Sequence, residues 1–238
     1  MIVLITGASG GIGSAAAKLF VEGGHEVHGL DVQPAPESLA RQDKVVGSEA
    51  AAADQTGGLG RYIHHIGDVR DPETFPKGLE PEVLVNCAGV QNSENDIEVN
   101  LKGTVNITEK YAIQNEKCKS VVNVGSASAH TGSEFPEYAA SKGGVMAYTK
   151  NVALRLAPRG ICNSIDAGGV RTELNSIVMD DPALWDQIME LTPLKRWATP
   201  EEIAEWIYFV GVTNRFMTGQ CLLIDGGEAG NAKFVWKD

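Results

Sequence analysis

Short apolar runs alternate along this chain with longer stretches of helical periodicity. Each apolar run has the length of a buried strand, and the longer stretches between them suit helices. A strand, a helix and a second strand in succession form a βαβ unit, in which the two strands lie parallel. The sequence therefore predicts an α/β fold: a doubly wound parallel sheet of about seven strands, with helices on both faces.

The predicted elements cover most of the chain. The predicted strands are Ile2 to Ile5, His25 to Asp31, Tyr62 to Ile66, Val83 to Val85, Val121 to Val124, Ile161 to Ile165 and Cys221 to Ile224. The main predicted helices are Ile12 to Glu22, Ile97 to Asn115 and Tyr138 to Leu156. Residues 33–60 show little periodicity, so we expect an irregular surface excursion with a short helix there. No linker is visible, and residues 1–238 are predicted to form a single domain.

Composition excludes several kinds of partner. The 238 residues carry a formal net charge of −11, whereas nucleic acids and anionic membrane surfaces attract basic proteins. Neither partner is therefore expected, and no metal site is predicted. The four cysteines are scattered without a C-x-x-C pair, and no signal peptide or apolar run of membrane-spanning length is visible. We expect reduced thiols and a cytoplasmic protein.

A glycine cluster, TGASGGIG (Thr6 to Gly13), directly follows the first predicted strand. Glycines let a backbone approach a pyrophosphate closely, and the free N–H groups at the start of the next helix attract its charge. Asp31 ends the second predicted strand, eighteen residues after Gly13. A carboxylate at that position binds the ribose hydroxyls of a dinucleotide. Loop, helix, strand and acid in this order indicate a dinucleotide site.

Two alternatives compete for the same residues. GASGG (Gly7 to Gly11) matches the G-x-S-x-G elbow of serine hydrolases, with Ser9 as nucleophile. That mechanism needs a downstream histidine, but the last hundred residues contain none, and an elbow behind the first strand is misplaced for such a fold. The other alternative is a tight structural turn followed by a solvated Asp31.

Tyr138 and Lys142 stand four residues apart in YAASK and share one face of a predicted helix. A phenol has a pKa near 10 and is a poor base at neutral pH, but a neighbouring ammonium lowers that pKa. The pair is therefore a candidate proton-transfer unit. The Y-x-x-x-K pattern alone is common by chance and usually marks ordinary helix surface.

Together these features resemble the short-chain dehydrogenase/reductase family over nearly the whole chain. Further pieces occur in the family's order: GDV (Gly67 to Val69), NCAG (Asn86 to Gly89), EVNLKGTVN (Glu98 to Asn106), VVNVGSASA (Val121 to Ala129), NSIDAGGVRT (Asn163 to Thr172), TPLKRWATPEEIA (Thr192 to Ala204) and LLIDGG (Leu222 to Gly227). The resemblance implies a single Rossmann-like NAD(P)-binding domain and hydride transfer between a nicotinamide and a carbonyl carbon.

The resemblance also implies a role for each matching residue. Tyr138 would be the catalytic acid/base, Lys142 would lower its pKa and hold the nicotinamide ribose, Ser126 would bind the substrate oxygen, and Asn100 would hold a water that relays protons. The implied cofactor-binding residues, besides Tyr138 and Lys142, are Gly7, Ser9, Gly11, Ile12, Gly13, Asp31, Asp68, Val69, Asn86, Ala88, Gly89, Val170 and Thr172. Some of these, such as Asn86, Asn100 and Thr172, also suit purely structural hydrogen bonds. Asp31 would repel a 2′-phosphate, so NAD is the expected cofactor.

The chain departs from the family pattern in several places, one of which is a longer interval from Asp31 to Asp68. Ser126 lies twelve residues before Tyr138, one fewer than expected, and Ala167 replaces a proline. The interval from Gly89 to Asn100 is short, as in bacterial 3α-hydroxysteroid dehydrogenase/carbonyl reductases, so the helix normally found there must be nearly absent. We expect the shortened interval to leave that side of the cleft open.

Residues 173–194 are predicted to form a substrate lid. Its apolar candidates for the pocket are Leu174, Ile177, Val178, Met179, Trp185, Ile188 and Met189. The expected function is NAD-dependent interconversion of a secondary alcohol and a ketone, with an apolar or hydroxysteroid-like substrate. The alternatives are a 3-oxoacyl-thioester reductase, a polyol dehydrogenase and, from another class, a non-catalytic dinucleotide-binding regulator. The family resemblance also implies a homo-oligomer, either a tetramer or a dimer.

Overall fold

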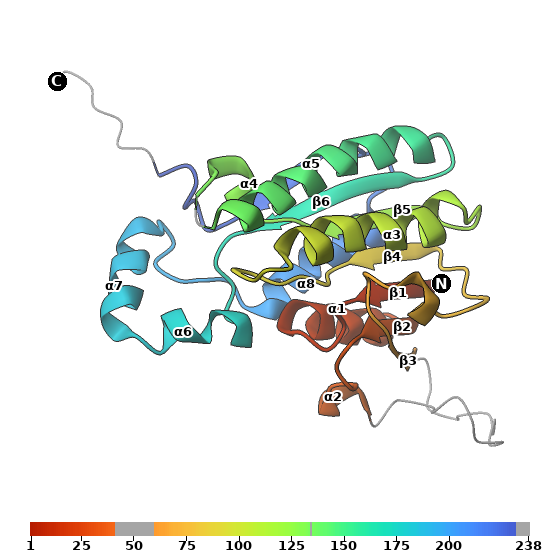
Figure 1. Ribbon diagram of the computed structural model, residues 1–238, viewed down its shortest axis with the longest axis horizontal. Coiled ribbons are helices and arrows are strands. Elements are labelled where there is room, and N and C mark those ends of the chain that lie inside the picture. The colour runs from red at the N-terminus through yellow and green to blue at the C-terminus, as the bar shows by residue number, and fades with distance from the viewer. Residues whose placement is uncertain (41–59, 134, 232–238) are drawn as a thin grey trace.

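The computed structural model describes residues 1–40, 60–133 and 135–231 of the chain. Within them, seven parallel strands form one sheet in the order β3-β2-β1-β4-β5-β6-β7 (Figure 1). The strands are β1 (Ile2–Thr6), β2 (Glu26–Asp31), β3 (Arg61–Ile66), β4 (Val83–Asn86), β5 (Ser120–Val124), β6 (Ile161–Ala167) and β7 (Cys221–Ile224). The direction of winding reverses between β1 and β4, so the sheet is Rossmann-like and doubly wound, as predicted.

Helices cover both faces of this sheet. On one face, α1 (Gly11–Glu22) packs against α8 (Pro200–Tyr208). On the other, α5 (Pro136–Leu156) packs against a continuous helical run that joins η2 (Ile97–Gly103), α3 (Thr104–Thr108) and η3 (Glu109–Ile113). The outer two segments of that run have π-type hydrogen bonding. The sequence predicted this run as one helix.

The strands are apolar on both sides because each side is covered by helices. Val3 and Ile5 belong to the hydrophobic cluster beneath α1 and α8, whereas Leu4 belongs to the cluster beneath α5 and η3. All three side chains are fully buried. The alternation of side chains along a strand thus divides the core into two layers.

Three shorter helical segments complete the body of the domain. They are η1 (Pro72–Thr74), α4 (Ser128–Thr131) and η5 (Phe209–Thr213). The excursion after β2 contains the short helix α2 (Glu37–Ala40), as expected. The rest of that predicted excursion, residues 41–59, lies outside the described residues. Between β4 and η2 the chain forms no helix, in agreement with the short interval in the sequence.

The predicted lid stands apart from the sheet, beyond the carboxyl ends of the strands (Figure 1). It contains η4 (Glu173–Asn175), α6 (Ser176–Met179) and α7 (Pro182–Leu191). Asp181 caps α7 by accepting hydrogen bonds from the N–H groups of Ala183 and Leu184, at 3.0 and 3.1 Å. No residue of α7 is buried, so this helix contributes little to the core.

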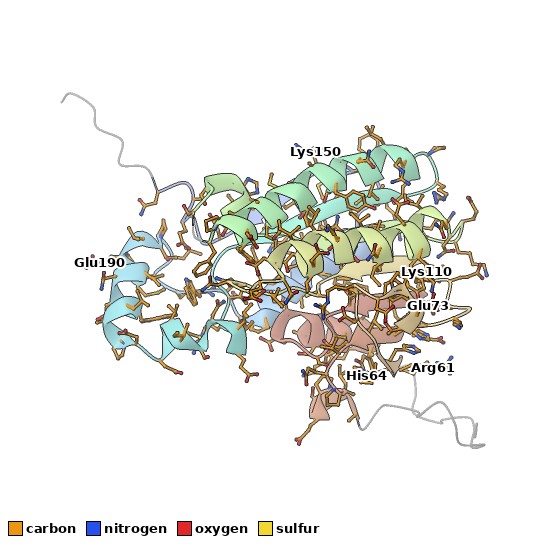
Figure 2. The ribbon with its side chains drawn as sticks, viewed as in Figure 1. Arg61, His64, Glu73, Lys110, Lys150 and Glu190 are labelled. Atoms are coloured by element: carbon orange, nitrogen blue, oxygen red, sulfur yellow. The ribbon has the colours of Figure 1, made fainter. Side chains whose placement is uncertain are left out.

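Charged side chains occupy the outer surfaces of the helices. Figure 2 shows Lys150 projecting from α5 and Glu190 from α7, both directed away from the sheet. Over the residues that the structure describes, there is no helix with the length and hydrophobicity needed to span a membrane.

The contact between α1 and α8 should be a main source of stability. Phe20 is fully buried on α1, and its ring centroid lies 5.0 Å from that of Tyr208 on α8. We expect Phe20→Ala to lower the free energy of unfolding by about 3–5 kcal/mol, because it removes apolar contacts and leaves a cavity. Urea denaturation would measure the change.

Phe216→Ala is the matched control, because the Phe216 side chain is 95% exposed. We expect this substitution to change the free energy of unfolding by less than about 0.5 kcal/mol. Equal losses in the two variants would contradict the assignment of Phe20 to the core.

Candidate active site

A cleft of about 1430 Å³ lies at the carboxyl ends of the strands, between the sheet and the predicted lid. Ligands of open α/β sheets bind at this edge, where the strand order reverses. The predicted cofactor-binding residues that line the cleft are Gly7, Ser9, Gly11, Ile12, Gly13, Asp31, Asp68, Val69, Ala88, Gly89, Tyr138, Lys142, Val170 and Thr172. Ser126 lines it too, whereas Asn86 and Asn100 do not.

The glycine turn closes against the chain that leaves β4. Gly7 has a φ of +65°, and a Cβ there would lie 2.7 Å from the backbone of Ala88. Thr6 joins the two turns, because its hydroxyl accepts hydrogen bonds from the N–H groups of Cys87 and Ala88, both at 3.1 Å. A Cβ at Gly13 would lie 2.0 Å from the Gly7 carbonyl oxygen. Only glycine fits at either position.

This turn leaves polar backbone groups at the cleft. Helix α1 begins after Gly10 and has no side-chain cap, so the N–H groups of its first turn have no partner at their own helix end. Gly11, Ile12 and Gly13 of that turn line the cleft. Such a helix end attracts a phosphate through both its N–H groups and its dipole. The turn therefore fits the pyrophosphate of a dinucleotide.

Asp31 ties the end of β2 to the glycine turn. One carboxylate oxygen accepts from the Ser9 N–H and the other from the Gln33 N–H, both at 2.9 Å. Among the described residues each oxygen accepts one hydrogen bond, and a carboxylate oxygen has capacity for a second. The remaining capacity fits the paired hydroxyls of a ribose. His64 on β3, labelled in Figure 2, holds the same rim by bonding the Gln33 carbonyl at 2.9 Å.

Asp68 is held by a residue that the sequence reasoning missed. The Arg70 guanidinium donates to both Asp68 oxygens at 2.6–3.0 Å, and it also donates to the Asn95 side chain at 3.2 Å. These bonds from Arg70 hold the pKa of the Asp68 carboxyl below its usual value. The Asp68 side chain is thus engaged by Arg70, and both residues line this end of the cleft together with Val69. No motif in the sequence marked Arg70.

Tyr138, Lys142 and Ser126 meet at the other end of the cleft. Lys142 is 7% exposed and donates to the Val124 carbonyl at 3.0 Å, while its Nζ lies 5.7 Å from the centroid of the Tyr138 ring. Helix α5 supplies both side chains from consecutive turns. Ser126 follows β5, and its hydroxyl donates to the Ser128 hydroxyl at 3.3 Å and accepts from the Ser128 N–H at 3.2 Å.

The two predicted asparagines lie behind the cleft rather than in it. Asn100 is buried and accepts from the Val90 N–H at 2.8 Å, and it donates to the Val90 carbonyl and the Ser141 hydroxyl at 2.9 and 3.0 Å. Its side-chain donors are therefore both used. Asn86 donates to the side chains of Thr108 and Asn123, both at 2.8 Å. Both asparagines hold the elements that form the site.

The shortened segment after β4 lines the cleft. Val90, Gln91, Ser93 and Asn95 all contribute to its wall. The segment is held there by Asn100, which binds both polar backbone groups of Val90, and by Asp96, which accepts from the Ser93 hydroxyl at 2.9 Å. These partly buried hydrogen bonds hold the segment at the cleft, and the expectation that this side of the cleft is open stays a prediction.

The lid presents apolar side chains to the cleft. Of the seven candidates, Leu174, Val178 and Ile188 line it, and the other four, Ile177, Met179, Trp185 and Met189, do not. Leu184, Leu191 and Trp197 line the cleft but were not predicted. Leu184, Ile188 and Leu191 have the i, i+4, i+7 spacing of one helix face, so helical periodicity within α7 was the signal that could have found them.

The loop after β6 closes the cofactor end. A Cβ at Gly11 would lie 2.6 Å from the methyl group of Thr172, so the glycine lets this loop rest on the start of α1. Val170 forms an isolated bridge with Ala198. Together, the uncapped helix, the close-packed glycine turn and the Asp31 carboxylate fit a nicotinamide dinucleotide laid along the strand ends.

Comparison with known proteins points to the same cofactor. The family model described as enoyl-(acyl carrier protein) reductase matches residues 77–228. The model of the NAD dependent epimerase/dehydratase family matches residues 3–148. Each match covers more than half of the chain.

Relatives and a solved structure extend over almost its full length. The L-rhamnose 1-dehydrogenase (NAD(P)(+)) of a Sphingomonas species is 33% identical over 250 residues, covering 94% of each chain. A 3-oxoacyl-[acyl-carrier-protein] reductase of Chlamydia pneumoniae is 31% identical over 247 residues, covering 94% of this chain and 95% of its own. The structure of 4-hydroxyisoleucine dehydrogenase complexed with NADH has a TM-score of 0.81 at 26% identity, over 97% of this chain and 99% of that one. The chain is an oxidoreductase that belongs to the short-chain dehydrogenase/reductase family.

Proposed function

We propose that the protein is an NAD-dependent oxidoreductase that interconverts a secondary alcohol with an apolar body and the corresponding ketone. One observation carries this proposal: a single cleft brings the glycine turn and Asp31 together with Ser126, Tyr138 and Lys142. The first group fits a dinucleotide, and the second offers the Ser126 and Tyr138 hydroxyls to a reacting oxygen, with the Lys142 ammonium beside the Tyr138 ring.

The chain's own residues manage the proton and the substrate oxygen. A bound nicotinamide dinucleotide supplies the exchange of a hydride with the substrate carbon. In the oxidation direction, the deprotonated phenol oxygen of Tyr138 accepts the proton of the substrate alcohol, and in reduction the phenol returns that proton to the substrate oxygen. Ser126 turns its hydroxyl from Ser128 to the same substrate oxygen, donates a hydrogen bond to it and so fixes its position. Lys142, anchored on the Val124 carbonyl, lies beside the Tyr138 ring and stabilises negative charge on the phenol oxygen.

The charges around Asp31 favour NAD over NADP. A 2′-phosphate would meet the Asp31 carboxylate at the rim of the cleft. Among the described lining residues, the Lys and Arg side chains are Arg70, which is bonded to Asp68, and Lys142, which lies beside Tyr138. Neither offers a free cation at Asp31. NAD, which carries hydroxyls there, has the complementary groups.

The apolar lining at the other end of the cleft favours a substrate with an apolar body. Leu174, Val178 and Ile188 of the lid face the cleft, and the acids Glu173 and Glu228 line it as well. Apolar side chains suit a hydrocarbon body, whereas a polyol would need a polar partner for each buried hydroxyl. The phosphate of an acyl-carrier thioester would need a basic group. A 3-oxoacyl thioester is the alternative that the relative from Chlamydia pneumoniae supports.

Removal of the Tyr138 hydroxyl tests the proton transfer. We expect Tyr138→Phe to lower kcat by roughly a hundred- to ten-thousand-fold, as positioned acid–base groups do. The affinity for NAD should be unchanged, because the ring remains. Tyr148→Phe on the same helix is the matched control, since the Tyr148 hydroxyl bonds Glu109 at 3.0 Å and does not line the cleft. Near-normal turnover by Tyr138→Phe would refute the assignment.

Cofactor choice should depend on the Asp31 carboxylate. We expect the wild-type enzyme to have a much higher kcat/KM with NAD than with NADP. Asp31→Ser should lower the ratio of kcat/KM with NAD to kcat/KM with NADP by about tenfold or more. A tenfold change in this ratio corresponds to a change of about 1.4 kcal/mol in the relative transition-state free energies. Glu22→Gln removes an exposed carboxylate at the far end of α1 and should leave the ratio unchanged. Similar kcat/KM values with both cofactors in the wild type would contradict this prediction.

Substrate size and charge give the third test of the proposal. We expect a polycyclic secondary alcohol to have a higher kcat/KM than 2-butanol, because it fills more of the apolar wall and displaces more water from it. A 3-oxoacyl thioester should be reduced less efficiently than a neutral ketone of similar length. Clear preference for the thioester would favour the acyl reductase alternative.

A further inference from the structure

A buried carboxylate lies directly behind the catalytic end of the cleft. Asp166 is the second-last residue of β6, and its side chain is 0% exposed. Aspartate is rarely buried so completely unless its oxygens have partners. One oxygen lies 2.6 Å from Nε2 of His130, and the other accepts the hydroxyl of Ser164. Neither Asp166 nor His130 lines the cleft.

His130 belongs to the segment that carries Ser126. It lies in α4 (Ser128–Thr131), a single helical turn with no side-chain cap. A helix this short is not stable without tertiary contacts. The bond from His130 to Asp166 is one such contact, and the bond from the Ala127 N–H to the Ala167 carbonyl, at 2.8 Å, is another. Both attach the segment to β6.

Asp166 also touches the chain on the other side of Ser126. A Cβ at Gly125 would lie 1.9 Å from the Asp166 carboxylate, so the two residues are in close contact. The Gly125 N–H bonds the Ile165 carbonyl at 2.9 Å. The Asp166 carboxylate thus contacts Gly125, the residue before Ser126, and through His130 it holds α4, the helix that follows Ser126.

The direction of the Ser126 hydroxyl depends on this segment. The Ser126 hydroxyl donates to the Ser128 hydroxyl at 3.3 Å and accepts from the Ser128 N–H at 3.2 Å, and Ser128 lies in the same segment. A shift of α4 would therefore carry Ser126 and its partner with it. A displacement of about 1 Å at a reacting group can cost on the order of a hundredfold in rate.

We propose that His130 and Asp166 are positioning residues that hold Ser126 at the substrate oxygen. The pair acts from behind the cleft and never touches the substrate. It fixes the segment between β5 and α5, which is also the segment that is one residue shorter than the family pattern. The proposal rests on the proposed function only in the role given to Ser126.

Kinetics of two His130 variants make the first test. We expect His130→Ala to lower kcat by about tenfold or more, with the dissociation constant for NAD unchanged. His130→Gln should recover most of that loss, because its amide N–H can still donate to Asp166. His25→Ala is the matched control, since His25 bonds Tyr208 and does not line the cleft. An unchanged kcat in His130→Ala would overturn the proposal.

A double-mutant cycle separates positioning from general damage to the fold. In a Ser126→Ala background there is no hydroxyl left to place, so we expect His130→Ala to lower kcat no further. If the two losses instead multiply, the pair does not act through Ser126 and the proposal fails.

Amide hydrogen exchange tests the attachment without any need for turnover. We expect His130→Ala to accelerate exchange in residues 125–132, with the strands β1 and β4 unaffected. Unchanged exchange in that segment would overturn the proposal, whatever the activity. If the wild-type enzyme oxidises no alcohol, the proposed function fails, and faster exchange would still support the attachment of the segment by His130 and Asp166.

Discussion

The close approach of two turns, one leaving β1 and one leaving β4, is the contact on which the site depends. The Thr6 hydroxyl accepts hydrogen bonds from the N–H groups of Cys87 and Ala88 in the second turn. Gly7 has no room for a side chain against Ala88. Where the winding of the sheet reverses, adjacent connections run to opposite faces and would leave a gap. Here backbone contact between the two turns closes the base of that gap. Gly13 packs on Gly7, Gly89 follows Ala88, and Asp31 is bonded to the N–H of Ser9, so these three residues line the cleft around the contact.

Much of this arrangement could be predicted, because it is local in the sequence. Buried parallel strands read as continuous apolar runs, and the order of loop, helix and acid marked the dinucleotide end. The directions of individual side chains could not be read in this way. Asn100 binds Val90 and Ser141, and Arg70 binds Asp68 and Asn95. These choices depend on which distant elements the fold places side by side, and spacing along one element carries no such information.

The two ends of the cleft differ in how they are built. The cofactor end consists mainly of backbone and short side chains held by close packing, as at Gly11 against Thr172. The substrate end is formed by longer side chains from the lid, the segment after β4 and the start of α5. Backbone groups at this end fit the pyrophosphate that all nicotinamide dinucleotides share, whereas the Asp31 side chain is the group that would distinguish NAD from NADP. At the substrate end, by contrast, each substitution of a lining side chain changes the shape of the site. The difference between the two ends suits a family with one cofactor chemistry and many substrates.

Helix α7 contributes three lining side chains to the substrate end, yet none of its residues is buried. Substitutions in such a helix remove little apolar surface from the core, so they rarely bring a protein below the stability that it needs to stay folded. A substitution in α7 is therefore expected to cost less folding free energy than one in the glycine turn, where a side chain has no room. Point mutations in α7 can therefore change the lining of the cleft with little loss of folding free energy, whereas mutations at the fully buried positions of the strands cannot.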